Sequence, residues 1–157
     1  MVTKNYLVAT SSSAPSNQAQ TVQSQVTYVD GLGRPIQQVA YKQSGTGGDL
    51  ITHMEYDDLG RATKSFLPYE RTSATLSMDG SAATNVANFY DDPYYQDTTN
   101  PYTESDLEKS PRARVEREAA PGVDWELGSG REVKYSYRFN NTNEVYLFTT
   151  TDNGSGA

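Results

Sequence analysis

Apolar and polar residues alternate in two neighbouring stretches of the chain, and a short polar turn divides each stretch. The first stretch has β-rich runs at 22–29 and 34–42, and the second has them at 50–56 and 62–67. Alternation with a period of two is typical of strands, and short turns between such runs indicate hairpins. The sequence therefore predicts an antiparallel meander that contains hairpins at 22–42 and 50–67.

The two turns repeat one phrase, Asp-x-Leu-Gly-Arg, at 30–34 and 57–61. An Asp that begins a turn accepts hydrogen bonds from backbone N–H groups shortly after it. The Gly supplies left-handed backbone that closes the hairpin, often with a bulge. The Arg begins the return strand, where it can cover an aromatic ring or pair with the turn Asp. The predicted turn residues are Asp30, Gly33, Arg34, Tyr56, Asp57, Gly60 and Arg61.

The pattern changes after the second hairpin. We expect 70–110 to be an irregular segment extended across the sheet, with one short helix at 82–90, where apolar residues have helical spacing. Two further strands are expected, at 5–10 and 112–118, and 11–25 is expected to be a polar loop that merges into the first hairpin.

Clean alternation returns near the C-terminal end, on both sides of the polar turn Asn140–Asn143, and predicts a third hairpin at 132–150. The expected fold is all-β, an antiparallel meander of hairpins with at most one or two short helical turns. A single domain would cover 1–150. The polar residues 151–157 are expected to be a linker or a cut in a longer chain.

Composition narrows the classes of function. Only 35% of the residues are hydrophobic and twelve are tyrosines, which suits sheet faces covered by amphipathic rings. A net charge of −7 argues against nucleic acid and anionic membrane partners. Without cysteine the chain has no disulfide and no thiolate metal site. No run approaches the ~20 apolar residues that span a bilayer.

Few residues suggest chemistry. His53 is the only histidine and lies inside an expected strand, so it suits a sheet face better than a general base. The acids of 91–108 leave calcium open, but their spacing matches no calcium loop. Exposed rings of Trp125, Tyr135 and Tyr137 could contact a glycan, although period-two spacing of the tyrosines also suits sheet packing. No catalytic residue, cofactor site or metal site is predicted.

The second turn also carries a family resemblance. Tyr56–Arg61 resembles the Tyr-Asp-x-x-Gly-Arg repeat of the Rhs and YD-repeat proteins. The first turn matches the same pattern, except that Val29 occupies the Tyr position and Tyr28 stands one position early. In order, 28–38, 55–68, 89–90 and 120–125 resemble the uncharacterised domain near the start of the repeat region in Rhs-like proteins of Bacteroidetes-type bacteria.

This resemblance implies a role rather than a reaction. Repeats of the Rhs kind build a hollow β-shell that can enclose a toxic domain, and this segment would open or cap such a shell. The implied partner is the rest of a longer parent chain, in a secreted or cell-surface protein. The alternative is a β module at the bacterial surface that binds carbohydrate or another protein. We expect no enzymatic activity.

Overall fold

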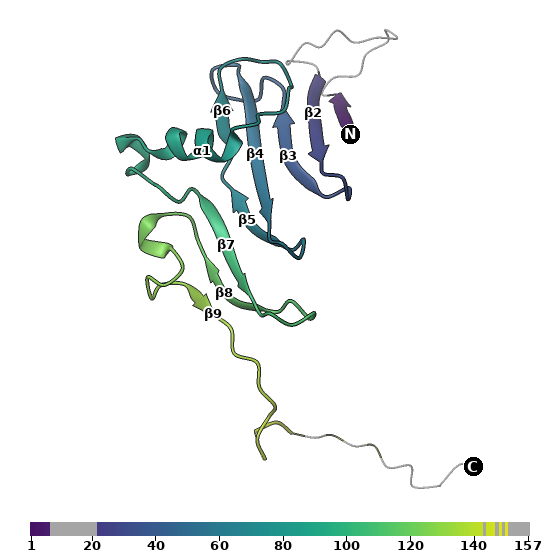
Figure 1. The fold of residues 1–157 in the computed structure, drawn as a ribbon, viewed down its shortest axis with the longest axis vertical. Coiled ribbons are helices and arrows are strands. Elements are labelled where there is room, and N and C mark those ends of the chain that lie inside the picture. The colour runs from purple at the N-terminus through teal and green to yellow at the C-terminus, as the bar shows by residue number, and fades with distance from the viewer. Residues whose placement is uncertain (7–21, 143, 147, 149, 151–157) are drawn as a thin grey trace, which may run out of the picture.

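The computed structural model describes residues 1–6, 22–142, 144–146, 148 and 150. These residues form one antiparallel sheet with the order β1-β2-β3-β4-β5-β7-β8-β9, and β6 pairs with β4 (Figure 1). The strands are β1 (Val2–Tyr6), β2 (Val22–Val29), β3 (Pro35–Ala40), β4 (Asp49–Tyr56), β5 (Ala62–Phe66), β6 (Tyr69–Arg71), β7 (Tyr102–Leu107), β8 (Val115–Ala119) and β9 (Val133–Lys134). The helices are α1 (Ala82–Tyr90) and the 3-10 helices η1 (Pro93–Tyr95) and η2 (Val123–Trp125). The all-β meander expected from the sequence is confirmed.

Both repeated turns close hairpins. β2 pairs with β3 and β4 pairs with β5, and each hairpin has a register shift immediately before its turn, at Tyr28/Val29 and at Glu55/Tyr56. Such a bulge follows from the tight turn, since one extra residue on one strand increases the local twist. The expected strand at 5–10 begins earlier, as β1, and 7–10 lie outside the described residues, as do 11–21 of the expected loop.

The expected irregular segment at 70–110 is wrong in its last third, where β7 pairs with both β5 and β8. Sequence reasoning missed β7 because acids occupy the positions where alternation would place apolar residues. Glu104 faces Lys64 at 3.7 Å and Asp106 pairs with Arg117. Cross-strand charge pairs can replace hydrophobic pairs in a half-exposed sheet.

The expected third hairpin at 132–150 is also wrong. Of the described residues in that range, only Val133–Lys134 form a strand, and they pair with β8. None of the described residues from 135 onward belongs to a strand. Alternation shows that a segment suits a sheet, but it does not show which strand becomes its partner. β8 itself forms a hairpin with β7.

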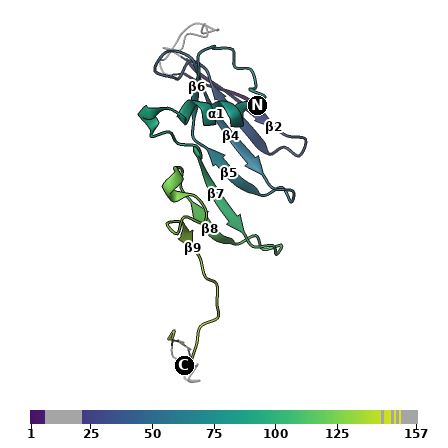
Figure 2. The same cartoon turned by 60° about the vertical axis from the view of Figure 1, so that its left-hand side comes forward.

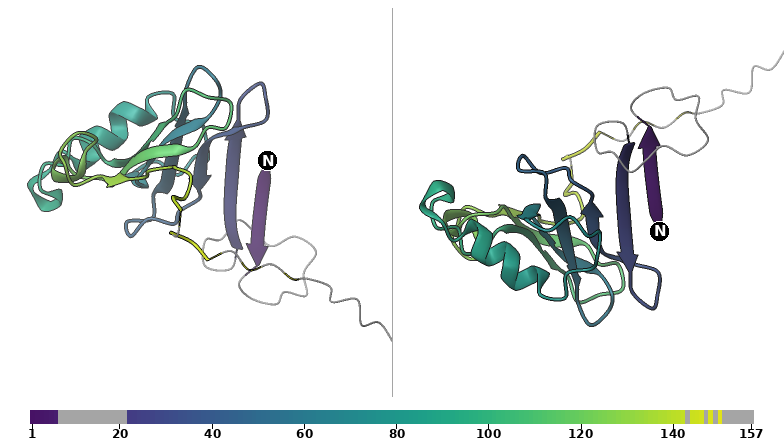
Figure 3. Two further views of the ribbon diagram at one scale, coloured as in Figure 1. Left: turned by 90° about the horizontal axis from the view of Figure 1, so that it is seen from below. Right: turned by 90° about the horizontal axis from the view of Figure 1, so that it is seen from above.

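The core lies on the face of the sheet that α1 covers. Its buried residues are Val39, Ile51, Phe66, Tyr69, Ala82 and Val86. Figures 2 and 3 show α1 lying across this face, where it contacts β4 and β6. α1 covers the expected residues 82–90, and its Val86, Phe89 and Tyr90 place one apolar side on the sheet. The core is small, because most of the described strands belong to one single-layered sheet and α1 covers only part of it.

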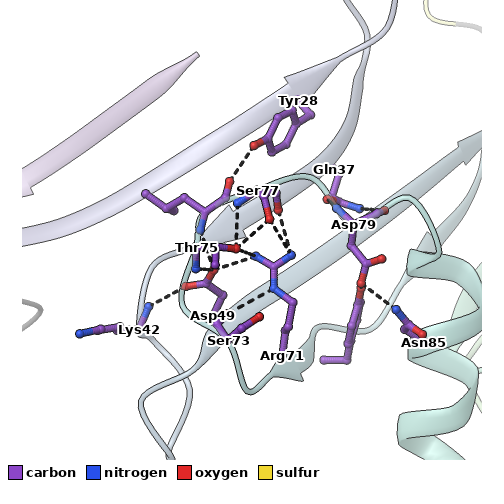
Figure 4. A network of polar contacts seen from close by, with 12 residues as sticks. Tyr28, Gln37, Lys42, Asp49, Arg71, Ser73, Thr75, Ser77, Asp79 and Asn85 are labelled. Carbon is purple, nitrogen blue, oxygen red and sulfur yellow. Dashed lines mark hydrogen bonds and ion pairs between the residues drawn. The ribbon is translucent and has the colours of Figure 1, made fainter.

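A buried carboxylate fastens the loop between β6 and α1 to the sheet (Figure 4). The Asp49 side chain is fully buried and accepts hydrogen bonds from the backbone N–H groups of Lys42, Thr75 and Leu76. The Arg71 guanidinium donates to the same carboxylate at 2.8 Å. Burial alone would raise the pKa of Asp49, but these hydrogen bonds outweigh it and the pKa is lowered.

The far end of this loop is held by a second amide–carboxylate cluster (Figure 4). Gln37 is buried and exchanges two hydrogen bonds with the Asp79 backbone. The Asp79 carboxylate accepts from the hydroxyl of Tyr69 at 2.6 Å and from Asn85 on α1. Burial and this carboxylate raise the pKa of Tyr69. Both clusters therefore position α1 over the sheet.

Candidate functional site

The turn at 30–34 is organised by the Asp30 carboxylate. One carboxylate oxygen accepts from the N–H groups of Leu32 and Arg34, each at 2.9 Å, and the other accepts from Arg34 Nε at 2.6 Å. Gly33 donates to the Asp30 carbonyl at 3.0 Å and has φ 81°. A residue with a Cβ is strained in that backbone conformation. Asp30 thus binds the backbone N–H groups of the turn, and Gly33 allows its positive φ.

The turn at 57–61 has the same contacts. Asp57 accepts from the N–H groups of Leu59 at 3.0 Å and Arg61 at 2.8 Å, and from Arg61 Nε at 2.7 Å. Gly60 has φ 78° and donates to the Asp57 carbonyl at 2.8 Å. The backbone N–H of the Arg is the main cause that lowers the pKa of Asp57, as it is for Asp30. The sequence repeat is therefore a repeat of geometry.

A third turn of the same kind lies between β7 and β8, and sequence reasoning did not find it. Glu108 takes the role of the Asp: its carboxylate accepts from Arg114 Nη2 at 2.8 Å and Nε at 3.0 Å. The Glu108 N–H donates to the Arg114 carbonyl at 2.9 Å, as the N–H of Asp30 does to the carbonyl of Arg34. Arg114 and Ser110 lower the pKa of Glu108 to about 2.

The position of the turn glycine is occupied by Ala113 in the third turn. Ala113 precedes Arg114 as Gly33 precedes Arg34, and it has φ 50°. Its N–H donates to the Ser110 carbonyl at 3.1 Å, which closes the turn as Gly33 does. The loop is two residues longer and has no glycine, so no motif marks it. The only signal available was an acid and an Arg that flank two β-rich runs.

Each arginine also reaches beyond its own turn. The Arg34 guanidinium lies over the ring of Tyr56, 4.6 Å from its centroid, and the Tyr56 hydroxyl donates to the Pro35 carbonyl at 2.8 Å. The Arg114 guanidinium lies over Tyr137, also 4.6 Å from its centroid, and the Tyr137 hydroxyl donates to the Val115 carbonyl at 3.0 Å. In both cases the hydroxyl bonds the residue that follows the arginine.

Arg61, in the second of the three turns, also contacts the next turn. Its Nη1 donates to the carbonyl of Glu108, in the next turn, at 2.8 Å. Arg34 also approaches the next turn closely, since a Cβ on Gly60 would clash with Arg34 Nη1. Figures 1 and 2 show the three turns at the same end of the strands. We call Arg34, Arg61 and Arg114, with Tyr56 and Tyr137, the arginine ladder.

The residues considered for glycan contact do not form one cluster. Tyr137 lies under Arg114, and Tyr135 donates its hydroxyl to Glu118 at 3.1 Å. Trp125 lies on η2, where it lines a groove with Tyr94 and Tyr95. Tyr28 packs against the core and bonds the Leu76 carbonyl at 2.6 Å, so it does not take the role of Tyr56.

Within the described residues, no group of three or more His, Asp or Glu side chains is arranged to hold a metal ion. Of the acids expected in 91–108, Glu104, Asp106 and Glu108 pair with Lys or Arg, and Asp92 accepts from the N–H of Tyr94 at 2.8 Å. His53 packs on Phe66, with ring centroids 5.2 Å apart. In the part of the chain that the structure covers, no helix is long and apolar enough to cross a membrane.

Comparison with known proteins gives one family. No curated protein matches the chain. A family model described as a domain of unknown function, DUF6443, matches residues 2–139, which include all nine described strands and the whole arginine ladder. The chain therefore belongs to the DUF6443 family.

Proposed function

We propose that this domain is a non-enzymatic structural section of a larger β-shell of the Rhs/YD-repeat kind, at the opening or cap of that shell. The parent would be a secreted or cell-surface bacterial protein, and the shell would enclose a toxic domain of that protein. The partner of this section is then the rest of the parent chain. Two features of the structure support this proposal.

The first feature carries the proposal: one contact recurs between an arginine turn and the chain segment that lies beside it. Arg34 and Arg114 make the same pair of interactions with Tyr56 and Tyr137, although the turns that hold them differ in length and sequence. A contact that links each unit to the next is the feature by which repeat architectures stack. The Arg–Tyr contact would hold neighbouring units together in a continuing sheet. It does not place a reactive group in a cavity.

The second feature is the open edge of the sheet beyond β9. Val133, Tyr135, Tyr137 and Phe139 alternate along the chain and are all between 43% and 96% exposed. Only β8 pairs with β9 among the described strands. Exposed edges with apolar side chains are usually shielded in proteins that function as isolated sheets. A further strand on this edge would cover the tyrosines and would extend the meander.

The test is an electron cryomicroscopy structure of a longer protein in which this domain is followed by YD repeats. The proposal expects a strand of the following segment to pair with 133–139 and an uninterrupted sheet to curve around an interior. It would be refuted if the domain were tethered by a linker, with the β9 edge still open to solvent.

A further inference from the structure

A groove lies at the ends of the strands opposite to the arginine ladder. It has a volume of about 520 Å³, between the segment that contains the end of α1 and η1 and the segment that contains η2. In Figure 1 these two segments lie side by side, away from the three hairpin turns. Tyr94 and Tyr95 come from the first segment, and Asp124 and Trp125 come from the second. Its size and its aromatic lining are those of a ligand site.

The tyrosine rings of the groove are held by one another. Tyr95 packs edge-on against Tyr94 and Tyr90, with ring centroids 4.9 Å apart in each pair. The Tyr90 hydroxyl donates to the Pro68 carbonyl at 2.7 Å, which anchors this cluster to the sheet. Tyr94 is nevertheless 84% exposed and Trp125 49% exposed. The Arg131 guanidinium lies over the Trp125 ring, 5.9 Å from its centroid, so the more exposed Tyr94 is the main platform for a ligand. A ring that is already held in place costs little entropy when a ligand binds.

The polar groups of the groove suit hydroxyls. Asp124 and Gln96 offer acceptors, and the Gln96 amide offers donors. Among the described residues, no hydrogen-bond partner is found for Trp125 Nε1 or for the Tyr94 hydroxyl. The residues that line the groove include no Lys or Arg, and Asp124 is paired with Arg131 at 3.2 Å. The groove thus carries little net charge, which disfavours anionic ligands.

We propose that this groove binds a neutral carbohydrate, with sugar rings packed on Tyr94 and Trp125. A sugar presents apolar C–H faces to aromatic rings, and its hydroxyls both donate and accept hydrogen bonds. A proline-rich peptide would also stack on these rings, but its prolines offer carbonyl acceptors and no N–H donors. The Gln96 carbonyl would then receive no hydrogen bond from the prolines. This proposal is independent of the role of the ladder.

The test uses the fluorescence of Trp125, the single tryptophan of the chain. The whole chain is titrated with neutral oligosaccharides of cellulose, starch, mannan and chitin, up to about 5 mM, above the ~1 mM range of weak binding. We expect a saturable change with at least one oligosaccharide. The variant Tyr94→Ala should weaken that binding by about tenfold, because it removes one stacked ring.

Tyr146→Ala is the matched control, since Tyr146 is 89% exposed and does not line the groove. It should bind as the native chain does. Far-UV circular dichroism checks that each variant is folded. The proposal is overturned if no oligosaccharide gives a saturable change, if Tyr94→Ala binds as tightly as the control, or if only a polyproline peptide binds.

Discussion

Arg34 is fixed by two residues on opposite sides, Asp30 in its own turn and Tyr56 at the end of the next hairpin strand. Its Nε lies 2.6 Å from Asp30 Oδ2, and its Cζ lies 4.6 Å from the centroid of the Tyr56 ring. A planar guanidinium can bond a carboxylate in its plane while its face covers a ring, and a lysine ammonium cannot do both. One residue thus joins a turn to its neighbour.

This geometry makes the two turn glycines unequal. Both have positive φ, so an alanine at either position costs about 1 kcal/mol of the free energy of unfolding. A Cβ on Gly60 would also displace Arg34, whereas a Cβ on Gly33 meets nothing within 4 Å. We expect Gly60→Ala to be the more destabilising change in urea unfolding. Equal losses for the two variants would contradict the close approach of Arg34 to the second turn.

The third turn predicts a stabilising substitution. Ala113 holds φ 50°, a conformation that costs a residue with a Cβ roughly 1 kcal/mol. We expect Ala113→Gly to raise the free energy of unfolding by about 0.5 kcal/mol. Ala62→Gly, at an exposed strand position whose φ is not positive, is the matched control and should destabilise the chain. A loss of stability for both variants would mean that Ala113 is not equivalent to Gly33.

Sequence reasoning predicted the first two hairpins because their turn residues are themselves the structural cause. Asp30 and Gly33 act through local backbone bonds, which a sequence motif can encode. The turn at 108–114 uses a longer acid and an alanine, so the same geometry carries no recognisable motif. Its equivalence depends on Arg114 lying over Tyr137, a contact between residues that are far apart in the sequence.

The groove was beyond prediction for a different reason. Trp125 was singled out as an exposed ring, and Tyr94 was assigned to an irregular segment. They lie close together because η1 and η2 meet at the same end of the strands, which follows from the pairing of β5 with β7. That pairing joins the Phe66 and Tyr102 rings at one position and the charged Lys64 and Glu104 at another, so β7 shows no continuous hydrophobic period.

The buried carboxylate that fastens the 72–81 loop predicts a large effect. In Asp49, Oδ2 accepts hydrogen bonds from Arg71, Thr75 and Leu76, and Oδ1 accepts one from Lys42. In Asp49→Asn, one of these two oxygens is replaced by an NH₂ group, which donates. We expect a loss of about 3 kcal/mol in the free energy of unfolding, since buried donors lose their acceptor. Asp58→Asn, in an exposed turn position, serves as the control. A loss below about 1 kcal/mol would contradict the network.

The pKa shifts predict how stability depends on pH. The pKa of Glu108 is about 2 in the folded chain against an ordinary 4.5, and that of Asp49 is also lowered. These groups bind protons more weakly when folded, so their contribution is complete above the ordinary pKa and is lost as the pH falls toward 2. We expect the free energy of unfolding to decrease across that range, and to decrease less steeply in Glu108→Gln. An identical profile for the variant would contradict the ion pair with Arg114.

The most direct test of the arginine ladder is a double-mutant cycle on Arg34→Ala and Tyr56→Ala, measured by urea unfolding. If the ladder joins successive hairpins, the two losses are not additive, and the coupling free energy is about 0.5–1 kcal/mol in favour of the native pair. Arg34→Ala with Tyr137→Ala, two residues from different rungs, is the control and should be additive. Additive losses for the Arg34–Tyr56 pair would show that the turns share a motif without stabilising one another.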